Sequence, residues 1–286
     1  MRVLSIQSSV VYGHVGNSAA VFPLQRLGHE VWPVLTVHFS NHTGYGEWRG
    51  PVLPAADVAD VIAGVADRGV LAECDAVLSG YQGDPAVGAV VLDAVSQVKA
   101  LNPDAVYCCD PVMGDVGRGM FVRPGIPEFM RDEAVPRADL ITPNQFELDF
   151  LAGTSTRSLD DVLAAADFVR ARGPRDVLVT SVLVDDTPVD SLDVVAVSDT
   201  HGAWAVTTPL LPITPNGCGD VTAALYLGHL LNWNWSRPTA LERTTASVFA
   251  IVETTMLLGT RELQLVAAQE TMVGPPPPTF TARQLR

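Results

Sequence analysis

The sequence contains a single lysine, Lys99, and this scarcity argues against two classes of phosphate-binding protein. A P-loop needs a lysine directly after its glycines, whereas Lys99 lies at the polar end of an expected helix, just before Leu101-Asn102-Pro103. Enzymes that hold pyridoxal phosphate as a Schiff base also need a lysine, and that lysine must face a pocket. A chain whose only lysine is placed in this way fits neither class.

Cysteines and long apolar runs are scarce as well, and both bear on the cellular compartment. The four cysteines, Cys74, Cys108, Cys109 and Cys218, show neither the spacing of a zinc site nor that of a disulfide framework. Free thiols in a reducing cytoplasm are therefore expected. No run of eighteen apolar residues is present, and the first residues are typical of a strand rather than a signal peptide, so we expect no membrane segment.

Positive charge is also in short supply, because 18 lysines and arginines stand against 32 acidic residues and give a net charge of −14. Such a charge argues against nucleic acid and against anionic membranes as partners. It also means that a phosphate-bearing ligand would have to be held by local groups, namely backbone amides and metal ions. We therefore expect small-molecule ligands.

Strands and helices alternate along the chain, which at 286 residues is long enough for one large α/β domain. The alternation predicts three layers, α/β/α, around a mostly parallel central sheet, and a hairpin of Asp193–Ser198 and Ala203–Thr207 extends that sheet. No internal repeat or linker is present, so a single domain over residues 1–286 is expected. The prolines of Pro275–Pro278 predict that the folded part ends in an extended tail from about residue 274. The expected parallel strands are Arg2–Ser8, Glu30–Val37, Asp75–Ser79, Ala105–Cys109, Asp139–Thr142 and Asp176–Ser181.

The stretch Asn216-Gly217-Cys218-Gly219-Asp220 opens an apolar segment with helical spacing. Glycine lets the backbone turn tightly and approach a ligand, and the amides that open a helix point at one spot, where they bind an anion. A carboxylate repels phosphate, but Asp220 fits this turn if it takes a proton from a hydroxyl that attacks a phosphoryl group. The alternative is an ordinary helix start with an aspartate in its first turn.

Two further acidic segments follow expected strands, at the edge where open parallel sheets bind ligands. Asp110 and Asp115 lie on a loop rich in proline and glycine, a pattern that suits Mg²⁺, although an acidic turn would look the same. Asn144 and Glu147 begin a helix after Pro143, where they could cap the helix only or could face the same cleft as Asp110.

The segment from His38 to Gly50 has no periodicity and is rich in aromatic residues, glycine, histidine and small polar residues. A surface loop of this length without periodicity is more often functional than not. His42 within it, taken alone, is more typical of a hydrogen-bonded structural histidine than of a catalyst.

Together these segments resemble the pyridoxal kinases of the ribokinase-like superfamily, over nearly the whole chain. A lone Gly-x-Gly-Asp would be a weak signal, but seven signatures occur in the right order. The segments around Ser8 and Thr43 separate this family from sugar kinases and hydroxymethylpyrimidine kinases. The signatures are Ser8-Ser9-Val10-Val11-Tyr12-Gly13-His14-Val15-Gly16-Asn17, Phe39-Ser40-Asn41-His42-Thr43, Leu78-Ser79-Gly80-Tyr81, Asp110-Pro111-Val112-Met113-Gly114-Asp115, Ile141-Thr142-Pro143-Asn144-Gln145-Phe146-Glu147, Thr180-Ser181 and Gly217-Cys218-Gly219-Asp220.

The resemblance implies a role for each matching position. Substrate would be bound by Ser8, which hydrogen-bonds the pyridine ring, by Thr43, Gly44 and Tyr81, and by the base Asp220. ATP would be bound by Asp110, Thr142, Asn144, Glu147, Thr180 and Ser181. Mg²⁺ would be organised by Asp110, Asp115 and Glu147, partly through water. The amides of Gly217, Cys218 and Gly219 would form the anion hole.

The implied activity is ATP-dependent phosphorylation of the 5′-hydroxymethyl group of pyridoxal, and of pyridoxine and pyridoxamine if the pocket admits them. The loop from His38 to Gly50 would close over the substrate and exclude water. The resemblance also implies a homodimer, and it leaves a requirement for K⁺ open. The alternatives are a hydroxymethylpyrimidine kinase and a non-catalytic carrier of pyridoxal phosphate, although a carrier gains nothing from a carboxylate beside a phosphate.

Two positions depart from the pattern of some family members. The loop Val116-Gly117-Arg118-Gly119-Met120 has no cysteine to trap an aldehyde. Thr180 stands where some members have a lysine, so this chain must neutralise ATP without that lysine.

Overall fold

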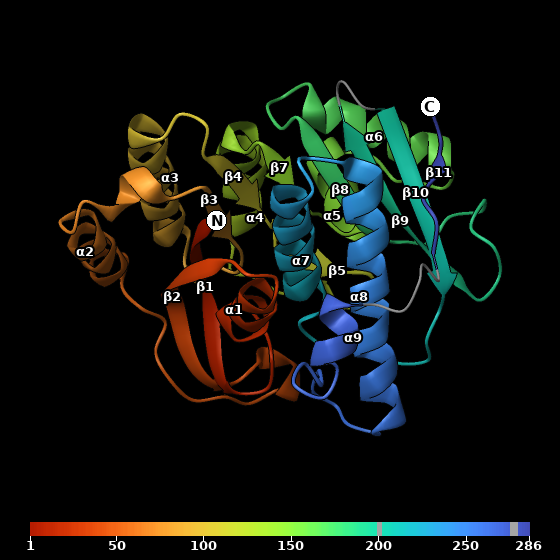
Figure 1. The fold of residues 1–286 in the computed structure, drawn as a ribbon, viewed down its shortest axis with the longest axis horizontal. Helices are drawn as coiled ribbons and strands as arrows, with labels where there is room; N and C mark the ends of the chain where they lie inside the picture. The colour runs from red at the N-terminus through yellow and green to blue at the C-terminus, as the bar shows by residue number, and fades with distance from the viewer. Residues whose placement is uncertain (199–201, 275–279) are drawn as a thin grey trace.

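The computed structural model describes residues 1–198, 202–274 and 280–286, and it contains three layers with a sheet in the middle (Figure 1). The strands lie in the order β11-β10-β9-β8-β7-β4-β3-β1-β2. The six from β2 to β8 pair in parallel, while β9, β10 and β11 add on in antiparallel pairs. The predicted fold class is therefore confirmed. The strands are β1 (Arg2–Tyr12), β2 (Glu30–Asn41), β3 (Ala76–Ser79), β4 (Val106–Cys109), β7 (Leu140–Ile141), β8 (Asp176–Val182), β9 (Ser191–Ser198), β10 (Gly202–Pro209) and β11 (Arg283–Gln284).

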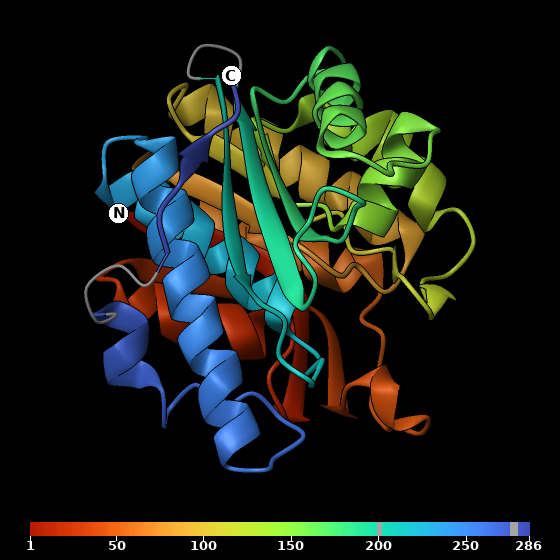
Figure 2. The same ribbon diagram turned by 90° about the vertical axis from the view of Figure 1, so that its right-hand side faces the viewer.

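Helices cover both faces of this sheet, as the two perpendicular views show (Figures 1 and 2). The helices packed on one face are α2 (Ala55–Ala66), α3 (Pro85–Leu101), α4 (Ile126–Phe129), α5 (Gln145–Ala152) and α6 (Leu159–Arg170). Those on the opposite face are α1 (Asn17–Arg26), α7 (Cys218–Asn232) and α8 (Arg237–Leu257), with α9 (Gln269–Val273) packed outside them. Short 3-10 or π turns cover Thr43–Tyr45, Val70–Glu73, Met130–Ala134 and Val135–Arg137.

The central strands are apolar on both faces because helices cover both. In β4, Tyr107 and Cys109 point into the core on one side of the sheet, whereas Val106 and Cys108 point into the core on the other. Side chains alternate in direction along a strand, so a strand between two helical layers must be hydrophobic at every position. This burial on both sides fixes where each strand ends, and hence where the polar residues that follow it lie.

The sheet's first two strands are longer than their hydrophobic runs predicted. β1 continues past a register shift between Gln7 and Ser9, and β2 continues to Asn41, so the predicted loop from residue 38 begins as strand. The amide of Asn17 donates to three backbone carbonyls of β1 and β2, and it thereby supports the irregular part of β1. The loop proper starts at His42, where the Thr43–Tyr45 turn follows.

The C-terminal residues return to the sheet. β11 pairs antiparallel with β10, and Phe280 is buried against Phe249 of α8. The expectation that the folded part ends near residue 274 is therefore wrong for residues 280–286, because two-residue pairing leaves no periodic pattern in a sequence. The expected proline-rich tail at 275–278 and the hairpin connection at 199–201 lie outside the described residues.

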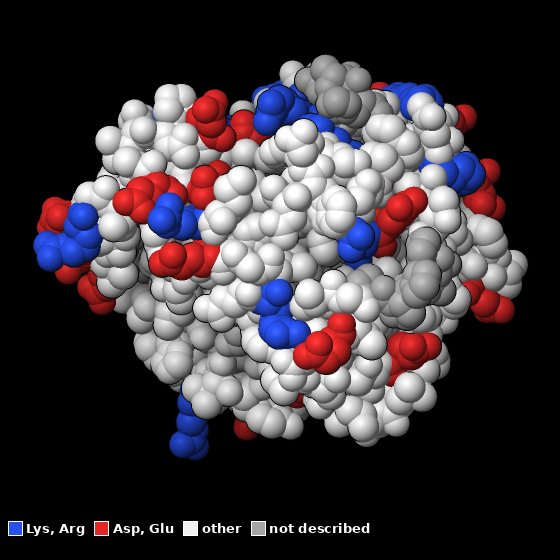
Figure 3. Space-filling view, in the orientation of Figure 1, with Lys and Arg blue, Asp and Glu red and all other residues white. Residues whose placement is uncertain are grey.

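The described surface in Figure 3 carries its basic side chains in small separate groups, interspersed with acidic ones and a broad uncharged area. Across the described residues, no helix is both long and apolar enough to span a membrane.

Candidate active site

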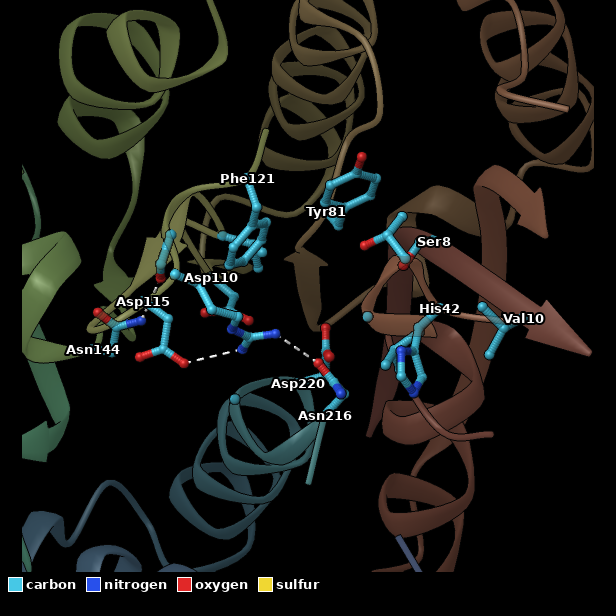
Figure 4. A pocket seen from close by; sticks show the side chains of 18 of the residues that line it. Ser8, Val10, His42, Tyr81, Asp110, Asp115, Phe121, Asn144, Asn216 and Asp220 are labelled. Atoms are coloured by element: carbon cyan, nitrogen blue, oxygen red, sulfur yellow. Dashed lines mark hydrogen bonds and ion pairs between the residues drawn. The ribbon is translucent and has the colours of Figure 1, made fainter. Parts of the chain in front are cut away.

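A cavity of about 290 Å³ opens at the carboxyl edge of the parallel strands. It collects residues from segments that are far apart in the sequence. In Figure 4, Ser8, Tyr81 and His42 lie on one side, Asp110, Asp115 and Asn144 lie on the other, and Asp220 lies between them. The predicted site residues that line this cavity are Ser8, Thr43, Gly44, Tyr81, Asp110, Asp115, Thr142, Asn144, Glu147, Thr180, Gly217, Gly219 and Asp220.

Two predicted site residues do not line it. Ser181 is exposed at a register shift near the end of β8, where its backbone has a φ of 55°. Cys218 is the first residue of α7, and its side chain is absent from the cavity wall. Its expected contribution is a backbone amide, which the position at the helix N-terminus still allows.

Gly217 sets the start of α7 against the loop that follows β1. Its φ is 92°, and a Cβ at this position would lie 1.9 Å from the carbonyl oxygen of His14. Only glycine fits both the left-handed backbone and the close approach. The 15-residue helix α7 therefore begins at the cavity wall, with its first amides and the positive end of its dipole at the cavity.

Asp220 lies in the first turn of the same helix and lines the cavity. Burial raises the pKa of its carboxyl to about 6, although hydrogen bonding to the backbone of Gly16 and Asp220 itself favours the charged form. A carboxyl with this pKa is ionised at neutral pH and is close enough to it to accept a proton from an alcohol during reaction. Gly16 also approaches Ser8, because a Cβ on Gly16 would lie 2.3 Å from the Ser8 hydroxyl.

Asp110, directly after β4, is buried beside other carboxyl groups. Its Oδ1 accepts a hydrogen bond from the Thr142 hydroxyl at 3.0 Å, while its Oδ2 has no hydrogen-bond partner among the described residues. Burial first, and then the nearby Asp220 and Glu147, raise the pKa of Asp110 well above its usual range. A buried oxygen without a partner among carboxyl groups is a place where a cation would be stabilised.

The sequence left two positions open for Glu147, as a cap of its helix or as a residue that faces the cleft. In the structure it caps α5 and also lines the cavity. Its Oε1 accepts from the amide of Met113 at 2.8 Å, and its Oε2 accepts from the amide of Asn144 at 3.0 Å, completing a capping box at α5. Burial raises its pKa to about 8, opposed by these amide hydrogen bonds. Asn144 in turn donates to the carbonyl of Gly114 at 2.8 Å, which fixes the two-stranded turn of β5 (Gly114–Asp115) and β6 (Gly119–Met120) beside the cavity.

The three carboxylates predicted to organise Mg²⁺ would share the ion with water and with the phosphates of a bound nucleotide. In the described parts of the chain, no three His, Cys, Asp or Glu side chains are gathered closely enough to hold a metal by themselves. Mg²⁺ does not need such a cage, since it keeps several waters and binds one or two carboxylates together with substrate phosphates. Asp110 offers a free oxygen, whereas Glu147 has both oxygens engaged and would act through water.

The other side of the cavity is largely apolar. Val10, Val37 and Phe39 line it next to Ser8 and Tyr81, and these residues come from β1, β2 and the segment after β3. A planar aromatic ligand would pack between such surfaces, with the few hydroxyls available to fix its orientation.

Ten residues that line the cavity had no site role in the sequence analysis, and three of them are polar: His42, Arg118 and Asn216. The other seven are Val10, Val15, Val37, Phe39, Val112, Gly114 and Phe121. The Nε2 atom of His42 lies 2.9 Å from Glu262, so His42 is a hydrogen-bonded histidine, as its sequence context predicted, and also a wall of the cavity. Asn216 directly precedes Gly217, and Arg118 lies between two glycines shortly after Asp115. The sequence did contain one indication for Arg118, since it is a basic residue in a glycine-rich loop close to an acidic residue.

Comparisons with known proteins agree with this arrangement. A family model described as phosphomethylpyrimidine kinase matches residues 58–264. The pyridoxal kinase PdxY of Rubrobacter xylanophilus is 60% identical over 276 residues, covering 96% of this chain and 95% of the relative. The pyridoxal kinase of Leishmania donovani is 29% identical, with 100% of this chain and 99% of that chain covered; its complex with ADP and ginkgotoxin superimposes with a TM-score of 0.91, and its complex with ADP and pyridoxamine with 0.90. The chain therefore belongs to the pyridoxal kinases of the ribokinase-like superfamily.

Proposed function

We propose that this enzyme transfers the γ-phosphoryl group of ATP to the 5′-hydroxymethyl group of pyridoxal and yields pyridoxal 5′-phosphate. The observation that carries the proposal is the position of Asp220. It lies at the N-terminus of α7, between an apolar wall with hydroxyls and a wall rich in carboxylates and amides. An aromatic alcohol on the first wall and a nucleotide on the second would meet at this carboxylate.

Asp220 acts as the general base in this proposal. It takes the proton from the 5′-hydroxyl as the oxygen attacks the γ-phosphorus in line with the departing ADP. The amides of Gly217, Cys218 and Gly219 stabilise the charge on the transferring group, and each such donor contributes roughly 10²–10³ in rate. Mg²⁺, when bound, would neutralise charge on the phosphates of ATP.

The remaining predicted residues position the two substrates. Ser8, Thr43, Gly44 and Tyr81 hold the vitamin ring so that its hydroxymethyl group faces Asp220. On the nucleotide side, Thr142, Asn144, Thr180 and Ser181 contact ATP, and Asp110, Asp115 and Glu147 hold Mg²⁺ with it. The loop from His42 to Gly50 closes over the ring and excludes water, a competing nucleophile.

A hydroxymethylpyrimidine kinase is the second candidate, because the matching family model is described as phosphomethylpyrimidine kinase. Full-length similarity favours the first candidate, since the Rubrobacter relative is a pyridoxal kinase and is 60% identical. Both reactions phosphorylate a primary alcohol on a heteroaromatic ring, so they would share Asp220 and differ in the ring pocket.

An ATP-coupled assay of the purified protein with Mg²⁺ tests the proposal directly. It compares pyridoxal, pyridoxine, pyridoxamine and hydroxymethylpyrimidine, and we expect pyridoxal to be turned over well. Turnover of hydroxymethylpyrimidine alone would overturn the ring-pocket assignment and keep the base. No turnover, together with tight binding of pyridoxal phosphate, would indicate a carrier.

The variant Asp220→Ala tests the base. We expect turnover to fall by roughly 10²–10⁴ while both ligands still bind, because proton transfer is lost and the walls remain. Near wild-type turnover in this variant would show that another group takes the proton.

We also propose a homodimer, a single folding domain and a cytoplasmic location. The homodimer rests on the family resemblance. The location rests on the four free cysteines, of which Cys74, Cys108 and Cys109 are buried. Light scattering coupled to size exclusion tests the dimer, a single cooperative unfolding transition tests the domain, and assays in K⁺ against Na⁺ test whether a monovalent ion is needed.

A further inference from the structure

Arg118 connects two walls of the cavity. Its Nη2 lies 3.0 Å from Oδ2 of Asp115, within the β5–β6 turn, and its Nη1 donates to Oδ1 of Asn216 at 2.9 Å, directly before Gly217. Figure 4 marks both contacts with dashed lines, one at Asp115 and one at Asn216. This side chain therefore links the β5–β6 turn to Asn216, two residues before α7.

Four acidic side chains line the cavity together with Arg118. Asp110, Asp115, Glu147 and Asp220 all line the cavity, whereas Arg118 is the one lysine or arginine among the described residues that line it. A phosphate chain entering this space would meet four carboxyl groups, and position 180, where some family members have a lysine, is threonine here. Apart from a metal ion, the positive charge available to the phosphates at this wall is Arg118.

The present partners of Arg118 are ones that it can give up. Its side chain is 52% exposed and that of Asp115 is 41% exposed, and an ion pair between side chains this exposed contributes little to stability. A guanidinium presents a planar fork of donors, which matches phosphate oxygens at least as well as it matches a carboxylate and an amide oxygen.

The loop around Arg118 also has room to move. Gly117 and Gly119 flank it with φ values of 85° and 69°. Apart from the adjacent residues, no heavy atom in the described part of the chain lies within 4 Å of the place where either Cβ would be. The two glycines therefore give the backbone freedom on either side of Arg118, while Gly119 pairs with Asp115 in the β5–β6 ladder.

We propose that Arg118 is a nucleotide-binding residue that exchanges partners: its guanidinium leaves Asp115 and Asn216 for the phosphate chain of ATP, and Asp115 is thereby released to the metal that accompanies the nucleotide. The proposal rests on the proposed function, because it takes ATP as the phosphate-bearing substrate. In the absence of nucleotide, Arg118 neutralises Asp115 and lowers its affinity for a cation. With nucleotide, two ion pairs replace one.

Equilibrium binding without pyridoxal tests this exchange on the full chain. The variants are Arg118→Met, which removes the charge, and Arg118→Lys, which keeps it. Arg131→Met is the matched control, because Arg131 also pairs with an aspartate, Asp132, and also lies over a phenylalanine ring, yet it lies away from the cavity. Calorimetry measures a non-hydrolysable ATP analogue with Mg²⁺, adenosine alone, and Mn²⁺ alone.

We expect Arg118→Met to bind the ATP analogue roughly 10- to 100-fold more weakly, the range of a lost hydrogen bond between charged groups, with Arg118→Lys in between. Adenosine should bind all proteins equally, since it has no phosphate. Mn²⁺ alone should bind Arg118→Met about two- to five-fold more tightly than the wild type, because Asp115 has lost its competitor. A merely structural role for Arg118 would not tighten metal binding.

Unchanged binding of the ATP analogue to Arg118→Met would overturn the proposal, as would an equal loss in Arg131→Met. Weaker Mn²⁺ binding to Arg118→Met would also overturn it, since Asp115 would then not be in competition. The two failures can be told apart. If the proposed function is wrong, the wild-type protein phosphorylates none of the four alcohols in the coupled assay. If only the role of Arg118 is wrong, the wild-type protein is active and the binding measurements on the variants show it.

Discussion

Glu262, in the segment after α8, accepts hydrogen bonds from His42 and Tyr45, which lie at the two ends of the turn beside the cavity. Its Oε1 lies 2.9 Å from Nε2 of His42 and accepts from the hydroxyl of Tyr45 at 2.7 Å, although 220 and 217 residues separate these pairs in the sequence. The guanidinium of Arg261 lies 3.8 Å from the Tyr45 ring centroid. The segment after α8 therefore holds the turn that carries Thr43 and Gly44, two residues of the cavity wall.

Replacing Glu262 with alanine should loosen this turn and weaken the binding of pyridoxal. We expect the KM for pyridoxal to rise roughly tenfold and the KM for ATP to change little, because the loss of a charged acceptor affects the ring side alone. The free energy of unfolding should fall by about 1–3 kcal/mol, since the hydroxyl of Tyr45 and the ring of His42 lose their partner. Steady-state kinetics with each substrate varied in turn measures the first effect.

Glu270→Ala is the matched control, because Glu270 pairs with Arg26 on the surface and its side chain is 84% exposed. It should alter neither KM. Equal increases in both KM values for Glu262→Ala would instead point to a general distortion of the cavity rather than to a looser turn.

The pKa of Asp220 predicts the pH dependence of catalysis. A general base must be unprotonated, and burial raises this carboxyl from its ordinary value near 3.8 to about 6. The value of kcat/KM for pyridoxal should therefore rise with pH below about 6 and level off above it. Steady-state rates between about pH 5 and 8 in Mg²⁺ measure this limb.

The same limb should appear with pyridoxine, because it belongs to the enzyme and not to the ring of the vitamin. If the pH at which kcat/KM levels off differs between pyridoxal and pyridoxine, the ionisation belongs to the substrate. The assignment of Asp220 as the base would then lose this support.

Local sequence predicted those parts of the site that depend on backbone chemistry. Gly217 and Asp220 could be placed at a helix start because a glycine of left-handed φ and an acid in the first turn act within a few residues. The capping pair Asn144 and Glu147 was found for the same reason. Their second role, facing the cavity, depends on the sheet that brings α5 beside α7.

Contacts between distant segments could not be predicted in this way. Arg118 points at Asn216 only because the β5–β6 turn folds over the N-terminus of α7, and nothing in its own loop encodes that direction. Glu262 reads as an ordinary acid after a helix, and only the folded chain places it against His42. β11 is two residues long, so it offers no hydrophobic period to detect.

The buried carboxyls also predict how stability depends on pH without ligands. Burial raises the pKa of Glu147 to about 8 and that of Asp110 well above its usual range, so the folded state holds protons that the unfolded chain releases. Their contribution to stability is present at low pH and is lost as pH rises through the folded pKa. The free energy of unfolding should therefore fall between about pH 6.5 and 8.5.

Below about pH 6.5, buried histidines act in the opposite direction, because burial lowers the pKa of His14, His29 and His229. Above about pH 6.5, the change in the free energy of unfolding with pH therefore reports the buried carboxyls. Urea unfolding in a chelator measures the slope, and Glu147→Gln should flatten it. A rise in stability over this window in the wild type would contradict the assignment of raised pKa values.

Gly217 and Gly219 provide a matched pair within one turn, and alanine should affect them in opposite ways. At position 217, alanine meets the His14 carbonyl oxygen and a φ of 92°, so the start of α7 must shift. We expect the free energy of unfolding to fall by about 1–3 kcal/mol and turnover to be nearly lost. At position 219, a Cβ would meet no other described residue within 4 Å outside its own helix turn, and alanine in a helix contributes about 0.5–1 kcal/mol of stability over glycine. Since Gly219 lines the cavity, the added methyl should nevertheless crowd a bound phosphate and lower turnover roughly tenfold.

Chemical unfolding and the coupled assay on both variants separate the effect on stability from the effect on turnover. Equal losses of stability in both variants would mean that the left-handed turn at Gly217 does not set the helix start. Full activity in Gly219→Ala would place the phosphate elsewhere.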